Sequence, residues 1–316
     1  MPTRVLITVD TELRWRHYAA GATWRENVAL SFDPAGVGVP WQLDLLAGHG
    51  LSACFFVDPM PAEVYGLGPI RAMVEPILAV GQEVQLHLHP CWQSVAAGNP
   101  NGEGFELTGF SAVEQQAMIA RARQLLIEAG APPPVAFRSG SFAANMDTLA
   151  ALAANGIAYD SSHNGSEHPW PSDLPLDPAA LAPVRLGGII EVPVTQIEDA
   201  PGHLRPMQFC AVSSEEIEAA LLHAEAEGHP LVNIVSHSFE FASRDGARPN
   251  RTLARRFEKL CAFLGRHRER FPTARFDSLG ELPLDAQARP LPARRLRTAR
   301  RVAQQVWSNA VYERAL

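Results

Sequence analysis

The amino-acid sequence predicts a single α/β domain, built as a distorted (β/α) barrel of about seven parallel strands. Two observations lead to this prediction. Short β-branched runs alternate with longer amphipathic segments, which is typical of a parallel sheet with crossover helices. Several of the short runs are apolar throughout, as expected for strands covered on both faces. The chain has 316 residues, of which 47% are hydrophobic, so a large core can form.

The expected strands follow one another at the spacing of an α/β barrel. They are 5–9, 52–57, 83–87, 135–138, 157–159, 189–192 and 231–236, with 275–277 as a candidate eighth strand.

Helices are predicted between these strands by their starting signals. The sequences SAVE at 111–114 and SSEE at 213–216 are capping boxes, and Asn145 is expected to cap a shorter helix. Two long polar stretches, 13–40 and 163–186, are expected to be loops. Loops of this length in a compact domain are often lids or binding walls.

Charge and cysteine content limit the partners and the compartment. The net charge of -7 gives no reason to expect a nucleic acid as a partner. The apolar run 5–9 is too short for the core of a signal peptide, and no stretch is long enough to span a membrane. Four cysteines without a pairing pattern favour free thiols in a reducing compartment, so we expect a cytoplasmic protein. They are Cys54, Cys91, Cys210 and Cys261.

The chain divides by composition into a barrel domain, 1–285, and an Arg-rich C-terminal tail, 286–316, expected to be helical. We predict that the tail is dispensable for catalysis, because it lacks site residues. It could pack on the domain as a solvated segment, or it could attach to an anionic membrane surface. In a helix its apolar face would hold Val302, Val306, Trp307 and Val311.

Polar residues end most of the predicted strands, where the reactive groups of parallel α/β barrels lie. They are Asp10, Glu12, Asp58, His87, His89, Arg138, Asp160, Glu191 and His237. Each alone could be a cap, an ion-pair partner or a surface residue, but together they indicate one polar rim.

The spacing within this rim predicts a metal site. Asp10 and Glu12 are two residues apart, as are His87 and His89, so each pair points to one face of an extended chain. Two imidazoles and a carboxylate are the ligands that zinc and similar divalent metals prefer. Such a metal can activate water near neutral pH, with one side chain acting as base and another as acid.

Six short motifs then give the chain a resemblance to carbohydrate esterase family 4, the polysaccharide deacetylases with a NodB homology domain. It is most similar to the branch that includes the lipopolysaccharide-biosynthesis protein WalW. The resemblance runs from about residue 4 to residue 282. The motifs are LITVDTE at 6–12, GQEVQLHLHP at 81–90, FRSGSF at 137–142, YDSS at 159–162, GIIEVPVT at 188–195 and IVSHS at 234–238.

The resemblance implies a metal site with altered ligands. Asp10 matches the catalytic base of the family, whereas Thr11 stands where a metal-binding aspartate is expected, so Glu12 must substitute. His87 matches the first histidine ligand. Cys91 stands at the position of the second, so we assign that role to His89, with Cys91 as the alternative ligand.

The remaining roles are also implied by the resemblance. Arg138 matches the arginine that orients the base, and His237 matches the general acid. Ser141 replaces a tyrosine whose backbone N–H helps to hold the oxyanion. Asp160 and Glu191 are assigned with Ser141 to substrate or oxyanion binding.

The expected function is therefore removal of an N-acetyl group from an amino sugar, with one divalent metal, most readily zinc, and an acetylated sugar as substrate. A cytoplasmic enzyme would act on a precursor of a surface glycan or lipopolysaccharide. Two alternatives stay open at this point. One is an amidohydrolase acting on a small amide, and the other is a non-catalytic carbohydrate-binding protein with the same fold.

Overall fold

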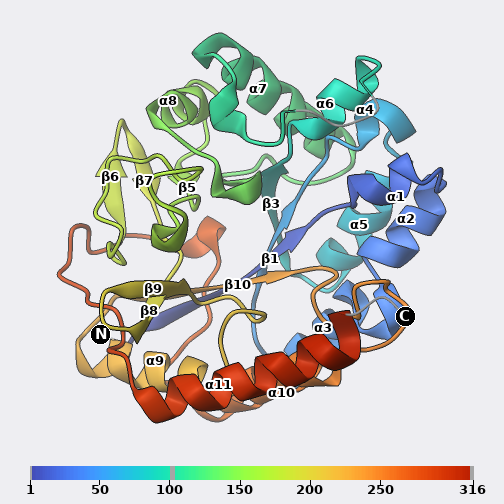
Figure 1. Cartoon of the computed structure of the whole chain (residues 1–316). Helices are drawn as coiled ribbons and strands as arrows, with labels where there is room; N and C mark the ends of the chain where they lie inside the picture. The colour runs from blue at the N-terminus through green and yellow to red at the C-terminus, as the bar shows by residue number, and fades with distance from the viewer. Residues whose placement is uncertain (1, 100–103, 314–316) are drawn as a thin grey trace.

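A curled, mostly parallel sheet forms the centre of the molecule, with helices packed around its outside (Figure 1). The computed structural model describes residues 2–99 and 104–313. The strand order is β10-β1-β2-β3-β4-β5-β7-β6, and every neighbouring pair is parallel except β6 and β7. The predicted barrel of about seven parallel strands is confirmed, as a curled half-barrel.

The strands are β1 (Arg4–Thr11), β2 (Cys54–Val57), β3 (Glu83–Leu88), β4 (Ala136–Ser139), β5 (Tyr159–Asp160), β6 (Val184–Leu186), β7 (Ile189–Glu191), β8 (Gln196–Ala200), β9 (His203–Pro206) and β10 (Leu231–His237). β8 and β9 form a separate antiparallel hairpin.

The α-helices are α1 (Trp15–Ala19), α2 (Trp24–Ser31), α3 (Val39–His49), α4 (Ala62–Tyr65), α5 (Gly68–Ala79), α6 (Cys91–Ala96), α7 (Ala112–Glu128), α8 (Met146–Ala154), α9 (Ser214–Ala226), α10 (Arg251–Arg266) and α11 (Arg295–Ser308). Short 3-10 turns are η1 (Pro34–Gly36), η2 (Leu107–Gly109), η3 (Gly140–Phe142), η4 (Gly165–Glu167) and η5 (Phe276–Ser278), and η6 (Asn309–Glu313) is a π-helical turn.

The helix starts that we predicted from capping residues are confirmed. Ser111, Asn145 and Ser213 each accept a hydrogen bond from the backbone N–H three residues later, in complete capping boxes. These bonds satisfy N–H groups that have no partner inside the helix, and thereby fix where α7, α8 and α9 begin.

Three predicted segments differ from the structure. The stretch 163–186, predicted to be a loop, contains η4 and ends in β6. The stretch 13–40 contains α1, α2, η1 and the start of α3, so the prediction of one long loop there is wrong. The candidate strand 275–277 is also wrong, since η5 covers most of it. The backbone N–H groups of Phe276 and Asp277 donate to the Glu83 carboxylate at 2.9 and 2.7 Å, instead of joining the sheet.

Strand register brings the functional residues together. In the pairing of β1 with β10, Asp10 lies opposite His237, and in the pairing of β3 with β4, His87 lies opposite Arg138. Adjacent strands are about 4.8 Å apart, so these side chains become neighbours although their positions in the chain are far apart. The carboxyl edge of the sheet therefore carries the polar rim.

The Arg-rich tail forms α11, which lies along the outside of the barrel (Figure 1). Gln305 donates to the carbonyl oxygen of Cys210 at 3.0 Å, and Ser308 is hydrogen-bonded to Asn250. Residues 314–316 of the tail lie outside the described residues. The boundary between residues 285 and 286 stays a prediction. Within the described residues, none of the helices has the length and apolarity to cross a membrane.

Candidate functional site

Arg138 and Asp10 form a buried ion pair at the floor of the rim. The Nη1 atom of Arg138 donates to Oδ1 of Asp10 at 2.8 Å, and the arginine has no exposed surface. A buried arginine needs partners for all its N–H groups. They come from Thr8, Ser161 and, more weakly, Asn233, at 2.9 to 3.5 Å.

Thr8, Ser161 and Asn233 were not predicted as site residues. Asn233 also donates to Ser161 Oγ at 2.9 Å, so the three form one network beneath Asp10. The signal available in the sequence was a single amide in the otherwise apolar run 231–235. An amide at an inward position of a buried strand requires hydrogen-bond partners and so points to a polar network.

Glu12, His87 and His89 come together as predicted from their spacing. One ligand atom from each lies within 4.8 Å of the others. The Nε2 atoms of His89 and His87 are 2.5 and 3.8 Å from Oε2 of Glu12. One carboxylate and two imidazoles that converge in this way suit zinc or a similar divalent metal.

Both histidines contact the end of β4 or the turn that follows it. His87 Nδ1 lies 2.7 Å from the carbonyl oxygen of Arg138, which leaves Nε2 free to face a metal. A Cβ atom at Gly140 would lie 2.4 Å from two atoms of the His89 ring. Only glycine therefore allows the ring to stay where it is.

The charge states also fit a site prepared for a cation. Burial lowers the pKa of His87 to about 4, so its imidazole is neutral, as a metal ligand must be. Burial opposes charge on His89 as well, but the nearby Glu12 carboxylate reverses this and raises its pKa to about 9. In turn, His89 and His87 lower the pKa of Glu12 despite burial. A bound metal would replace the proton that His89 carries near neutral pH.

Cys91, the alternative ligand, is not part of this cluster of described residues. Burial raises the pKa of its thiol well above the usual range, which disfavours the thiolate that zinc binds. Asp58 is another neighbour of His89 and helps to raise the pKa of that imidazole. Its burial raises its pKa to about 7, and its Oδ2 atom has no hydrogen-bond partner within the described chain. The sequence places Asp58 at the end of a predicted strand but gives it no role.

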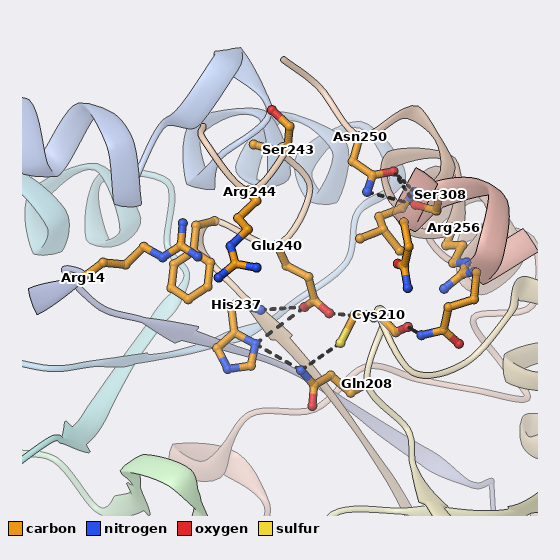
Figure 2. Close-up of a pocket in the computed structure, with 15 residues that line it drawn as sticks. Arg14, Gln208, Cys210, His237, Glu240, Ser243, Arg244, Asn250, Arg256 and Ser308 are labelled. Carbon is orange, nitrogen blue, oxygen red and sulfur yellow. Dashed lines mark hydrogen bonds and ion pairs between the residues drawn. The ribbon is translucent and has the colours of Figure 1, made fainter. Parts of the chain in front are cut away.

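His237 lies beside Asp10 at the end of β10 and contacts Glu240. Its Nδ1 atom is 3.7 Å from Oε2 of Glu240, and Gln208 Nε2 lies 3.4 Å away (Figure 2). Burial would lower the pKa of His237, but Glu240 outweighs it and raises the pKa to about 9. Glu240 is anchored in turn by the backbone N–H groups of Cys210 and His237. Glu240 was missed in the sequence, because it follows the last motif in an irregular loop.

Asp160 and Glu191 do not reach the rim. They lie opposite each other on β5 and β7, and both are fully buried. Burial raises the pKa of both groups, and the neighbouring Asp160 carboxylate raises that of Glu191 further. The geometry gives no support for the predicted substrate contact, because no atom of either side chain is accessible.

Ser141 lies on the exposed turn that follows β4. Ser141 and Phe142 both have left-handed backbone angles, with φ of 55° and 58°. Such conformations are unfavourable for residues other than glycine and are often found at functional sites. The turn lies directly after Gly140, so Ser141 is near His89.

Two cavities meet at the rim. The smaller, of about 230 Å³, is lined by Glu12, His89 and the aromatic residues Trp15, Trp92, Phe105 and Phe239. The larger, of about 420 Å³, contains His237 and Glu240 (Figure 2). Arg14 and Phe239 line both, with the guanidinium stacked 4.2 Å from the ring centre.

The larger cavity has one wall from the tail. Gln305, Ser308 and Asn309 of α11 and its C-terminal end line it. The sequence did not predict this contribution, because α11 carries none of the motif residues.

The fold is shared with solved structures. A provisionally assigned polysaccharide deacetylase from Mycobacterium smegmatis is 20% identical, with a TM-score of 0.54, and the match covers 92% of this chain and 94% of that one. This likeness confirms the NodB-type deacetylase barrel as the fold.

Two further solved structures are more distant. A family 4 carbohydrate esterase from Streptomyces lividans in complex with acetate is 12% identical, with a TM-score of 0.44, over 90% of this chain and 98% of that one. A family 4 pseudoenzyme from Bacillus anthracis is 10% identical, with a TM-score of 0.43, over 86% and 64%. No protein-family model and no curated protein matches the sequence.

Proposed function

We propose that this chain is a metal-dependent hydrolase that removes an N-acetyl group from an amino sugar during synthesis of a surface glycan or lipopolysaccharide precursor. One observation carries the proposal: the Glu12–His87–His89 cluster and the Asp10–Arg138 and His237–Glu240 pairs share one rim. From the motifs alone, we also propose a place in the branch that includes WalW.

The proposed chemistry follows from where each group lies. Bound zinc would supply Lewis acidity toward the acyl oxygen and the attacking water. Asp10, fixed by Arg138 at 2.8 Å, accepts a proton from that water. His237, whose pKa of about 9 keeps it protonated near neutral pH, donates a proton to the leaving nitrogen. The backbone N–H of Ser141 is the proposed oxyanion donor.

The aromatic cavity supports a sugar over a small amide as substrate. Trp15, Trp92, Phe105 and Phe239 offer flat apolar surface next to Glu12 and His89. Binding sites commonly combine such apolar walls with a few polar groups that fix the ligand. A sugar ring placed there would bring its acetamido group to the metal site.

Metal binding and acetate release test this function together. We expect the purified protein to hold one zinc ion per chain and to release acetate from acetylated amino sugars. His87→Ala and His89→Ala should each lose most of the metal and the activity, because each removes one of the three ligands. Cys91→Ser is the matched control and should keep both. Full metal occupancy in both histidine variants would refute the ligand assignment, and loss only in Cys91→Ser would identify the thiol.

We further propose that the protein acts in the cytoplasm, at the surface of an anionic membrane that carries its substrate. The four unpaired cysteines are in keeping with a reducing compartment. The orientation of α11 supports the membrane contact. Arg297 and Arg301 are buried, and Arg301 pairs with Asp199 and Glu216 at 2.7 and 3.2 Å. The inward face of the helix is therefore its charged face.

The outward face of α11 is apolar. Val302, Val306 and Trp307, predicted to share a face, are exposed by 46%, 64% and 67%, whereas Val311 is half-buried. Exposed Arg294 and Arg295 flank this face at its N-terminal end. An apolar helix face with tryptophan and nearby arginines is suited to the boundary between lipid headgroups and acyl chains.

Vesicle binding checks the membrane contact. We expect the protein to co-sediment with vesicles rich in phosphatidylglycerol. Val306→Glu should weaken binding roughly tenfold or more, because it removes an apolar side chain that the membrane would bury. Val113→Glu is a matched control, since Val113 is 78% exposed on α7, which is a different helix. Equal binding by both variants, or none by the wild type, would refute the role of α11.

A further inference from the structure

The larger cavity differs in character from the aromatic one. It is lined by the three arginines Arg14, Arg244 and Arg256, together with His237, against the single carboxylate of Glu240. In Figure 2, Arg14 and Arg244 lie on the side of His237, and Arg256 lies on the side of Ser308. The wall formed by these side chains is positively charged, and it adjoins the group that we propose as the acid.

Arg256 provides the second observation. It is only 3% exposed, and Nη1 donates to the carbonyl oxygen of Phe209 at 2.6 Å. Its Nε and Nη2 atoms are buried and have no acceptor within the described residues. Buried N–H groups of a charged side chain that lack an acceptor are costly and rare in folded proteins. They are explained if a ligand supplies the missing acceptor.

The residues around Arg256 do not supply that acceptor. Glu240, the nearest carboxylate in the cavity wall, already accepts hydrogen bonds from the backbone N–H groups of Cys210 and His237. Glu216 is engaged by Arg301 and by its capping box. Within the described residues, neither carboxylate accepts a hydrogen bond from Arg256 Nε or Nη2, and the arginine lines the cavity.

We propose that this cavity is an anion subsite that binds a phosphate group attached to the acetylated amino sugar. The arginine side chains outnumber the single carboxylate in this lining, which favours a negatively charged ligand such as a phosphate or diphosphate group. Arginine is the side chain best suited to phosphate oxygens, because its planar fork donates two parallel hydrogen bonds.

The position of the subsite defines the substrate class. Arg14 and Phe239 line both cavities, so a ligand can extend from the aromatic cavity into the arginine-lined one, past His237. The sugar would occupy the first and its phosphate the second. This inference rests on the proposed function and narrows the substrate to a phosphorylated acetamido sugar, either nucleotide-linked or lipid-linked.

Direct binding separates the subsite from catalysis. We would measure, by titration calorimetry on the metal-loaded full chain, the binding of N-acetylglucosamine, its 1-phosphate, its uridine diphosphate ester and a short-chain prenyl diphosphate ester. A phosphorylated ligand should bind at least tenfold more tightly than the neutral sugar. Preference for one of the three phosphorylated ligands then identifies the source of the phosphate.

Variants test which residues carry this preference. Arg244→Met and Arg256→Met should each reduce the preference roughly 10- to 100-fold, as expected for loss of a charged hydrogen bond. Arg248→Met is the matched control, since Arg248 is exposed in the same loop but does not line the cavity. If Arg256→Met does not fold, Arg244→Met still tests the subsite, because Arg244 is exposed and its replacement should not disturb folding.

The outcomes distinguish the subsite from the proposed function. Equal binding of neutral and phosphorylated sugars by the wild type, or an equal loss in Arg248→Met, would overturn the subsite. Deacetylation of the neutral sugar would then still support the hydrolase. Phosphate-dependent binding without acetate release from any ligand would instead retain the subsite and refute the hydrolase.

Discussion

Asp10→Asn and His237→Ala are each expected to lower the rate of deacetylation by about 100- to 10,000-fold, with metal content unchanged. The two residues lie opposite each other on β1 and β10, so they can serve the two sides of one reacting carbon. Amide nitrogen leaves poorly as an anion and must be protonated, whereas the attacking water must first lose a proton. Two groups with different protonation states meet this requirement better than one.

Asparagine at position 10 tests the base without disturbing the floor of the rim. Its Oδ1 atom can still accept the hydrogen bond that Arg138 donates to Asp10. The matched control for His237→Ala is His203→Ala, a solvent-exposed histidine on β9. Acetate release and bound metal are followed together. Turnover near that of the wild type in either variant rejects the mechanism, and loss of metal in Asp10→Asn would place Asp10 in the coordination shell.

The sequence predicted the fold and the metal cluster because both depend on short-range patterns. Alternating apolar runs and capping residues identify parallel strands and helices, and residues two apart on a strand must share a face. Glu12, His87 and His89 therefore converge once β1 and β3 join one sheet. Spacing indicated the two pairs, whereas the choice of Glu12 over Asp10 as the ligand came from the family resemblance.

Some errors came from overlooked local signals. Thr23 and Glu26 form a capping box at the start of α2, inside the stretch predicted to be a loop. Gly187 and Gly188 have φ of 52° and 90° and join β6 to β7, a hairpin that the glycine pair could have predicted. Both patterns were present in the sequence.

Other features depend on tertiary contacts that no short pattern encodes. Glu83 binds the backbone of Phe276 and so replaces the strand expected there, although about 190 residues separate them. α11 lines part of the larger cavity only because it packs against Cys210 and Asn250. Asp160 and Glu191 were predicted to lie at the rim because they end strands. Their burial depends on how far each strand extends, which the sequence does not show.

Arg138→Met is expected to produce the largest loss of stability, about 3–5 kcal/mol in the free energy of unfolding, as for other buried ion pairs that lose one partner. Arg138 is fully buried, and it donates to Asp10, Thr8 and Ser161. Methionine fills similar volume but leaves the Asp10 carboxylate buried without its partner. Urea denaturation of the metal-loaded protein measures the loss.

A double-mutant cycle separates the role of Arg138 in folding from its role in orienting the base. In Arg138→Met with Asp10→Asn, the unpaired charge is removed, so the two changes should cost about 1–3 kcal/mol less together than the sum of the single changes. Arg138→Lys keeps the charge but cannot reproduce the planar set of donors that reaches Asp10, Thr8 and Ser161. It should recover part of the stability while the rate stays low. Additive costs in the cycle would show that Arg138 and Asp10 are not energetically coupled. A normal rate in Arg138→Lys would show that Asp10 acts as the base without the planar set of donors.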